Sequence, residues 1–205
     1  MEQQTIQLRW NDAPLDVRAP VGLTGPGTLA VQNGDWREPD RVLVQLTDTP
    51  DGQGEPEPDQ WPGESGQVTA WTHPERNTPT EEVTVTVEQA RLTGDFYNGT
   101  GYRGHLPRRL RLVLGQGASL EGVISATQVR FDGDGAAHQT FCNGGNEVSV
   151  TLRDGAQWTV QGAGYLTSLT VGKGCRFVGT VLLDDRQTSV PKGKTLEGLL
   201  LVLPE

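Results

Sequence analysis

Four glycines recur at a regular spacing in the second half of the chain. They are Gly117, Gly155, Gly174 and Gly193; the last two intervals are equal, and the first is twice as long. Each is followed three residues later by a large apolar residue. These partners are Leu120, Trp158, Phe177 and Leu196. A fixed period of about 19 residues is typical of a stacked repeat, in which each turn of the chain repeats the shape of its neighbour.

Aligning the segments at this period produces two apolar columns and a partly hydroxylic column between them. The apolar columns are Leu114, Leu152, Val171 and Val190, and Leu112, Val150, Leu169 and Thr188. The column between them is Val113, Thr151, Thr170 and Ser189. Alternation of apolar and polar residues within each copy predicts half-buried strands. The glycines then mark corners, where a positive φ or a close backbone approach is needed.

These features predict an all-β chain that folds as a parallel β-helix, a solenoid with coils of about 19 residues, over residues 81–205. An earlier coil is expected from Val83, because Leu92 and Gly94 match Leu120 and Gly122. The composition agrees with this class, since 27 glycines and 13 prolines supply turns and no stretch predicts a long amphipathic helix. Residues 97–107 and 131–146 interrupt the period and are expected to form excursions, the second a protruding insertion of loop-type sequence.

Residues 1–80 are organised differently. Short strand-like runs at residues 5–10, 15–18, 28–31 and 41–46 predict an irregular β segment that supplies early coils or a cap on the solenoid. Residues 48–66 contain four prolines, six acidic residues and no basic residue, which predicts a flexible loop or linker.

The formal net charge of −9 argues against nucleic acid as a partner, because phosphate binding needs a basic face. Four arginines between Tyr102 and Arg111 are a local exception, which we interpret as a solvated rim that offsets nearby acids. No apolar run is long enough to cross a bilayer as a helix, so no membrane insertion is expected. The sequence starts MEQQTIQL, which does not have the pattern of a signal peptide. We expect a secreted or cell-surface protein whose signal has been removed, with a cytoplasmic protein as the alternative.

Few residues point to chemistry. The histidines and cysteines have no metal-ligand spacing, so we expect no metal and no cofactor. Asp184 and Asp185 are weak catalytic candidates, since paired carboxylates serve glycoside hydrolysis; a coil corner is the other interpretation. Cys142 and Cys175 form either a disulfide or two free thiols.

Aromatic residues in turn-rich segments suggest a ligand-binding surface. The candidates are Trp71, Tyr97 and Tyr102, together with Arg103. Exposed aromatic rings on loops contact carbohydrates or proteins, but the same residues also serve to bury the base of a loop.

The stretches QWTVQG at residues 157–162 and YLTSLT at residues 165–170 resemble a phrase of bacterial surface β-helices. DFYN at residues 95–98 and GVISAT at residues 122–127 are similar to further parts of it. The likeness is to the pectin-lyase-like solenoids of autotransporter passengers and spans about residues 83–203. It implies a right-handed parallel β-helix on the cell surface or secreted, with a role in adhesion or display.

Three hypotheses follow. The first is a non-catalytic surface module whose insertions bind a glycan or a host or cell-surface protein, with oligomerisation through the solenoid ends. The second is a carbohydrate-active enzyme, a polysaccharide lyase or hydrolase, that uses Asp184 and Asp185 with the arginine cluster. The third is an ordered hydroxyl surface of the ice-binding type, made by Thr151, Thr170 and Ser189.

Overall fold

The chain is all-β. The computed structural model describes residues 5–17, 20–47, 79–100, 107–131, 137–141 and 146–205, and no helix occurs among them. The strands of the first half are β1 (Gln7–Trp10), β2 (Ala13–Leu15), β3 (Val21–Leu23), β4 (Gly27–Leu46), β5 (Glu81–Asn98), β6 (Arg108–Leu114), β7 (Ser119–Gly122) and β8 (Ile124–Ser125). Those of the second half are β9 (Thr127–Phe131), β10 (Ala137–Phe141), β11 (Glu147–Leu152), β12 (Gln157–Val160), β13 (Gly164–Val171), β14 (Arg176–Val178), β15 (Thr180–Leu183), β16 (Arg186–Thr188) and β17 (Thr195–Leu203).

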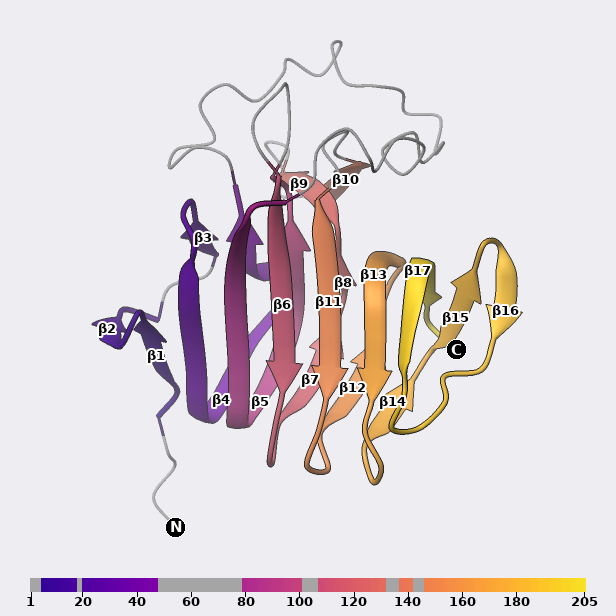
Figure 1. Cartoon of the computed structure of the whole chain (residues 1–205). Coiled ribbons are helices and arrows are strands. Elements are labelled where there is room, and N and C mark those ends of the chain that lie inside the picture. The colour runs from indigo at the N-terminus through magenta and orange to yellow at the C-terminus, as the bar shows by residue number, and fades with distance from the viewer. Residues whose placement is uncertain (1–4, 18–19, 48–78, 101–106, 132–136, 142–145) are drawn as a thin grey trace.

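The front row in Figure 1 is a ladder of parallel strands in the order β4, β5, β6, β11 and β13. Its register places residues one repeat apart directly beside one another. The inward columns are Leu112, Val150 and Leu169, and Leu114, Leu152 and Val171. All six side chains are buried. The two apolar columns predicted from the sequence are therefore confirmed for these members.

A second parallel ladder lies behind the first and consists of the latter part of β5 followed by β7, β12 and β14 (Figure 1). Trp158 lies beside Leu120 on one strand and beside Phe177 on the next. Leu92 pairs with Leu120, as the predicted coil from Val83 requires. The glycine-linked apolar residues thus stack for three of the four copies.

A third, shorter row closes the space between the two ladders. Val44 of β4 pairs with Phe96 of β5, and Phe96 pairs with Ile124 of β8. The amide of Ala126 then donates to the carbonyl of Tyr165 at the start of β13, at 2.9 Å. Side chains from all three rows meet in one hydrophobic core.

Trp158 is the largest fully buried side chain of this core. Its indole Nε1 donates to the carbonyl of Gly122 at 3.1 Å, so its one polar group is satisfied in the interior. Its ring meets that of Phe177 edge to face, with centroids 5.3 Å apart. Phe177 is only partly buried, because β14 is the last strand of its ladder.

Three of the repeated glycines, Gly117, Gly155 and Gly174, form the turns that connect the first ladder to the second, and Gly193 forms the turn before β17. Their φ angles are +68° at Gly117, +79° at Gly155, +81° at Gly174 and +74° at Gly193. In each turn the residue after the glycine donates its amide to the carbonyl three residues earlier, as Ala156 does to Arg153 at 3.1 Å. The predicted need for left-handed backbone at these corners is confirmed, and glycine adopts it without steric cost.

For the fourth copy of the repeat, the prediction holds at the Gly193 turn and is wrong for the strands on either side of it. Asp184 and Asp185 adopt φ values of +50° and +63°, which make a tight reversal between β15 and β16, an antiparallel hairpin. After the Gly193 turn, β17 runs antiparallel to β13 and places Leu196 beside Leu169 instead of Phe177. Thr188 therefore pairs with Val181 in the hairpin, and Thr195 takes the place beside Thr170 that was predicted for Ser189. Val190 is partly buried and packs against the core.

The segment before residue 48 both extends the ladders and covers their edge. β4 is parallel to β5 along most of its length, with register shifts between Arg37 and Val44. β1 pairs antiparallel with the beginning of β4 and also with β2, and β3 pairs parallel with its end. The described residues of this region are strands, and early coils and a cap remain the two interpretations of it.

The excursion predicted at residues 131–146 contains strand structure rather than loop alone. β9 and β10 pair antiparallel and form a separate two-stranded sheet (Figure 1). The excursion predicted at residues 97–107 starts later than expected, because Tyr97 and Asn98 still belong to β5. In the part of the chain that the structure describes, no helix is long and apolar enough to cross a membrane.

The Gly174 corner offers a clean test of the backbone argument. A Cβ at Gly174 would meet nothing within 4 Å, so only the left-handed conformation opposes a side chain there. We expect Gly174→Ala to lower the free energy of unfolding by about 1 kcal/mol, measured by urea denaturation. Gly22→Ala is the matched control, because Gly22 also has free space but no positive φ. Equal effects of the two substitutions would contradict the assignment.

Candidate functional site

The chain leaves the ladders repeatedly at one corner, between the third row and the first ladder. One inward-facing column of the first ladder shows this, because residues that are neighbours in the column are separated by unequal numbers of residues in the sequence. This column is Val31, Val87, Leu114, Leu152 and Val171. Only the last interval equals the repeat, and the three before it are longer. Most of their extra residues leave between the end of the third row and the start of β5, β6 and β11. We call this place the insertion corner.

Asn98 holds the insertion corner together. Its side chain is fully buried at the end of β5, and its amide donates to the carbonyls of Arg108 at 2.8 Å and Glu147 at 2.9 Å. Its Oδ1 accepts from the amide and the hydroxyl of Thr100, at 3.3 and 2.7 Å. Both donors and both acceptor positions of the carboxamide are therefore used. One side chain connects the beginnings of β6 and β11 to the end of β5.

Two further residues complete this buried network. Asn146 donates from Nδ2 to the carbonyl of Asn98 at 2.5 Å, and the Thr100 hydroxyl accepts from the amide of Arg108 at 2.9 Å. Asn146 is 4% exposed and Thr100 is fully buried. Such groups cost free energy when buried without partners, so the network is stable only because its members satisfy one another.

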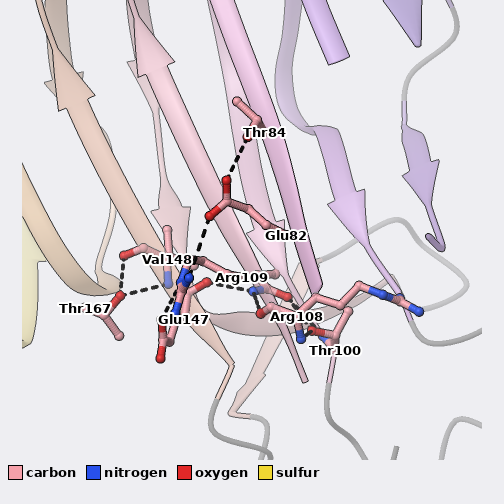
Figure 2. Close-up of polar contacts among 9 residues, drawn as sticks. Glu82, Thr84, Thr100, Arg108, Arg109, Glu147, Val148 and Thr167 are labelled. Carbon is pink, nitrogen blue, oxygen red and sulfur yellow. Dashed lines mark hydrogen bonds and ion pairs between the residues drawn. The ribbon is translucent and has the colours of Figure 1, made fainter. Parts of the chain in front are cut away.

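A row of alternating charges lies beside the insertion corner on the outer face of the first ladder, as Figure 2 shows. Arg109 of β6 lies between Glu82 of β5 and Glu147 of β11 in the strand register. Its Nε is 2.6 Å from an Oε2 oxygen of Glu147, and its NH1 nitrogen is 3.7 Å from Oε2 of Glu82. The hydrogen bond to Glu147 raises the pKa of Arg109 above its ordinary value, against the opposing effect of burial.

Arg108, the residue before Arg109, connects β6 to β5 and to the residue that follows β4. Its Nε is 2.9 Å from Oε2 of Glu81, and its guanidinium donates to the carbonyl of Thr47 at 3.1 Å. Arg108 therefore contacts Thr47, the residue that follows β4, as well as its neighbour strand β5. The arginines predicted as a rim that offsets nearby acids do pair with glutamates at these two positions.

Tyr97 does not present its ring to solvent. It is 2% exposed and packs with Val42 and Val123 on the outer side of the third row. Its hydroxyl donates to Oδ2 of Asp95 at 2.9 Å, while Oδ1 of Asp95 accepts from the amide of Val123 at 2.7 Å. Of the two interpretations of this tyrosine, burial at the base of an excursion is confirmed, and surface exposure is wrong.

Asp184 and Asp185 lie at the tip of the β15–β16 hairpin and are exposed. Asp184 lines a cavity of about 500 Å³ together with Arg186 and the following two residues. Asp185 acts on Tyr165, whose pKa is raised above its ordinary value of 10.0 first by burial and then by this negative charge. The expected coil corner is instead a hairpin turn.

The other candidates from the sequence are not brought to this site by the described residues. Trp71, Tyr102, Arg103 and Cys142 lie outside the described part of the chain, as do residues 48–66. Cys175 is a buried free thiol. Within the described ranges, no group of three or more His, Cys, Asp or Glu residues is placed to hold a metal ion. Thr151 and Thr170 lie side by side, but Thr195 rather than Ser189 follows them.

Sequence reasoning missed Asn98 and Asn146. A signal was present, because each lies in an Asn-Gly-rich stretch at the end or beginning of a strand, in YNGT and NGGN. Comparison of the chain with protein-family models, with curated proteins and with solved structures gave no match.

Loss of the Asn98 side chain tests the corner network. We expect Asn98→Ala to lower the free energy of unfolding by about 2–4 kcal/mol, because it leaves two backbone carbonyls and Thr100 without their partner. Asn98→Asp should cost at least as much, since a carboxylate opposes both carbonyl oxygens with a negative charge. Urea denaturation measures both, with the exposed Gln157→Ala as a control expected within about 0.5 kcal/mol. A loss as small as that of the control would contradict the role of Asn98.

The raised pKa of Tyr165 predicts that the folded chain loses stability at alkaline pH. Because its pKa is higher in the folded chain than in the unfolded chain, its stabilising contribution is complete below about pH 10 and falls as pH rises through the folded pKa. Thermal unfolding of the wild type and Tyr165→Phe from about pH 9 to pH 11.5 should show a steeper decline for the wild type. Parallel curves would rule out this contribution.

Proposed function

We propose that this chain is a short parallel β-helix, right-handed as the resemblance implies, with coils of about 19 residues. Three features support this architecture: the parallel ladders, the pairing of residues one repeat apart, and the left-handed glycine turns between the ladders. The antiparallel β17 then closes one end of the stack. Its backbone pairs with β13, which leaves less of that edge open to other chains.

The function that this geometry supports best is a non-catalytic module, secreted or on the cell surface, for adhesion, display or structural support. Its inserted segments would bind a glycan or a protein. The observation that carries the proposal is the insertion corner, where successive passes of the chain depart side by side from one rigid network around Asn98. Segments of different length are held together on a fixed frame, as binding loops are on other rigid scaffolds.

The alternative, a carbohydrate-active enzyme, has less support from the hairpin carboxylates. Asp184 and Asp185 are adjacent residues of an exposed turn. A glycosidase needs two carboxylates facing one another across a bond, with one held in an environment that raises its pKa. A solvated turn provides neither arrangement.

The proposal is tested by binding with and without the insertions. The wild type is applied to a glycan array and a panel of cell-surface proteins, and compared with a variant whose residues 50–76 are replaced by a short Gly-Ser linker. A second variant replaces residues 101–106 in the same way. We expect at least one replacement to weaken binding tenfold or more, about 1.4 kcal/mol, with unchanged thermal stability. Gln157→Ala serves as a surface control and should bind as the wild type does.

Two results would overturn the proposal. One is binding that neither replacement weakens. The other is cleavage of a polysaccharide by the wild type that Asp184→Ala or Asp185→Ala abolishes, which would establish the enzyme instead.

A further inference from the structure

All three lysines of the chain lie in two turns at the end of the fold that contains β13 and β17. Lys173 is in the turn between β13 and β14, and Lys192 and Lys194 are in the turn before β17. Arg176 follows the first of these turns and begins β14. We call these four residues the basic corner. It lies where the strands of the first ladder end, whereas the insertion corner lies where they begin (Figure 1).

Direct contacts between the two turns bring the cations of the basic corner together. The amide of Gly193 donates to the carbonyl of Val171 at 2.8 Å, and the Lys192 ammonium donates to the carbonyl of Cys175, also at 2.8 Å. The aliphatic part of Lys173 lies over Gly193, because its Cγ and Cε atoms are each 3.8 Å from the position that a Cβ would take there. The second turn is therefore fixed against the first, and their cations lie side by side.

Neighbouring acids do not neutralise the basic corner. Its four residues are exposed, and none of them forms an ion pair within the described part of the chain. Between Asp154 and Glu197 the sequence has only two acidic residues, Asp184 and Asp185, at the tip of the β15–β16 hairpin. In the adjoining turn, by contrast, Arg153 lies 3.6 Å from Asp154. A chain with a net charge of −9 therefore keeps an unpaired positive patch at this corner.

The small extent of the basic corner limits the shape of its partner. A broad anionic surface, such as a lipid bilayer or a nucleic acid duplex, would also face the acidic remainder of the chain and be repelled by it. A narrow anionic polymer contacts the basic corner alone. Ammonium groups and the planar guanidinium of Arg176 bind carboxylates through charge-assisted hydrogen bonds.

The composition of the two turns distinguishes among narrow anionic polymers. Residues 172–176 and 191–194 contain no aromatic residue. Phe177, which comes next, directs its ring to Trp158 in the core. Single-stranded nucleic acids bind largely by stacking their bases on aromatic rings, and sugar rings also pack on aromatic faces. An acidic peptide segment needs only cations in fixed positions, which the two turns provide.

We propose that the basic corner binds an acidic segment of a partner protein, an extended stretch rich in Asp and Glu. Its carboxylates would accept hydrogen bonds from the ammonium groups of Lys173 and Lys194 and from the guanidinium of Arg176. Lys192 adds positive charge while its ammonium stays bonded to the carbonyl of Cys175. This surface goes beyond the proposed display function and shares no residue with the insertion corner.

Fluorescence anisotropy tests the proposal with a labelled peptide of alternating Glu and Ser and a comparison peptide with Gln in place of each Glu. We expect the acidic peptide to bind at least tenfold more tightly, with an affinity that falls as sodium chloride is added. The corner variant, Lys173→Gln with Lys194→Gln, should weaken this binding tenfold or more. Arg91→Gln with Arg111→Gln is the matched control, since it removes the same charge from two exposed arginines elsewhere, and should bind as the wild type does.

Several results would overturn the proposal. Failure of the acidic peptide to bind is one, and an equal loss of binding in the matched control is another, because it assigns the effect to net charge. Tighter binding of dextran sulfate or a single-stranded oligonucleotide, lost in the corner variant, would assign the surface to those polymers. Sedimentation that shows a dimer of the wild type, dissolved in the corner variant, would assign it to a second copy of the chain.

The test is independent of folding and of the display function. Both substitutions of the corner variant change exposed side chains, and Gln at residue 173 keeps the Cγ that lies over Gly193, so thermal unfolding should match the wild type. The insertion replacements should leave binding of the acidic peptide intact. A surface protein whose binding the corner variant removes is bound at the basic corner, so the two proposals fail separately.

Discussion

In-register stacking of parallel strands is the constraint on which the rest of this structure depends. Each side chain in a ladder lies about 5 Å from its counterparts on the neighbouring strands, so every column must tolerate its own repetition. Leucine and valine columns do so inside, where burial of each such side chain contributes about 1.5–3 kcal/mol. Outside, identical charges would repel. The alternation of Glu82, Arg109 and Glu147 along one column meets that condition.

The stacking also explains how far the sequence could be interpreted. A regular repeat with Gly corners was enough to predict the all-β class and the columns through Leu112, Leu114 and Leu120. Periodicity indicates which residues face inward, and that property does not depend on the length of an excursion between strands. The match of Leu92 to Leu120, across an interval longer than the repeat, was found for the same reason.

The failures have physical causes as well. A glycine turn followed by an apolar residue looks the same before a parallel and an antiparallel strand, so Leu196 was assigned to the wrong neighbour. The reversal depends on the left-handed backbone of Asp184 and Asp185. Aspartate can adopt this conformation, but no glycine stands at these positions to mark the turn in the sequence. Asn98 was missed because its partners, Arg108 and Glu147, are 10 and 49 residues away. The Asn-Gly pattern around Asn98 marks the end of a strand, but it does not indicate which distant carbonyls the side chain reaches.

The insertion corner has a consequence for how a chain of this kind changes length over evolution. A residue gained inside a ladder would shift every later side chain to the opposite face, so the regular part tolerates gain or loss only in whole repeats. At the corner the chain returns to the same columns whatever number of residues has left. The three longer, unequal intervals therefore bring residues into the same buried column as the final, regular interval does. The number of inserted residues can vary there without changing the strand register. New segments can therefore be added at the insertion corner without changing the packing of the core.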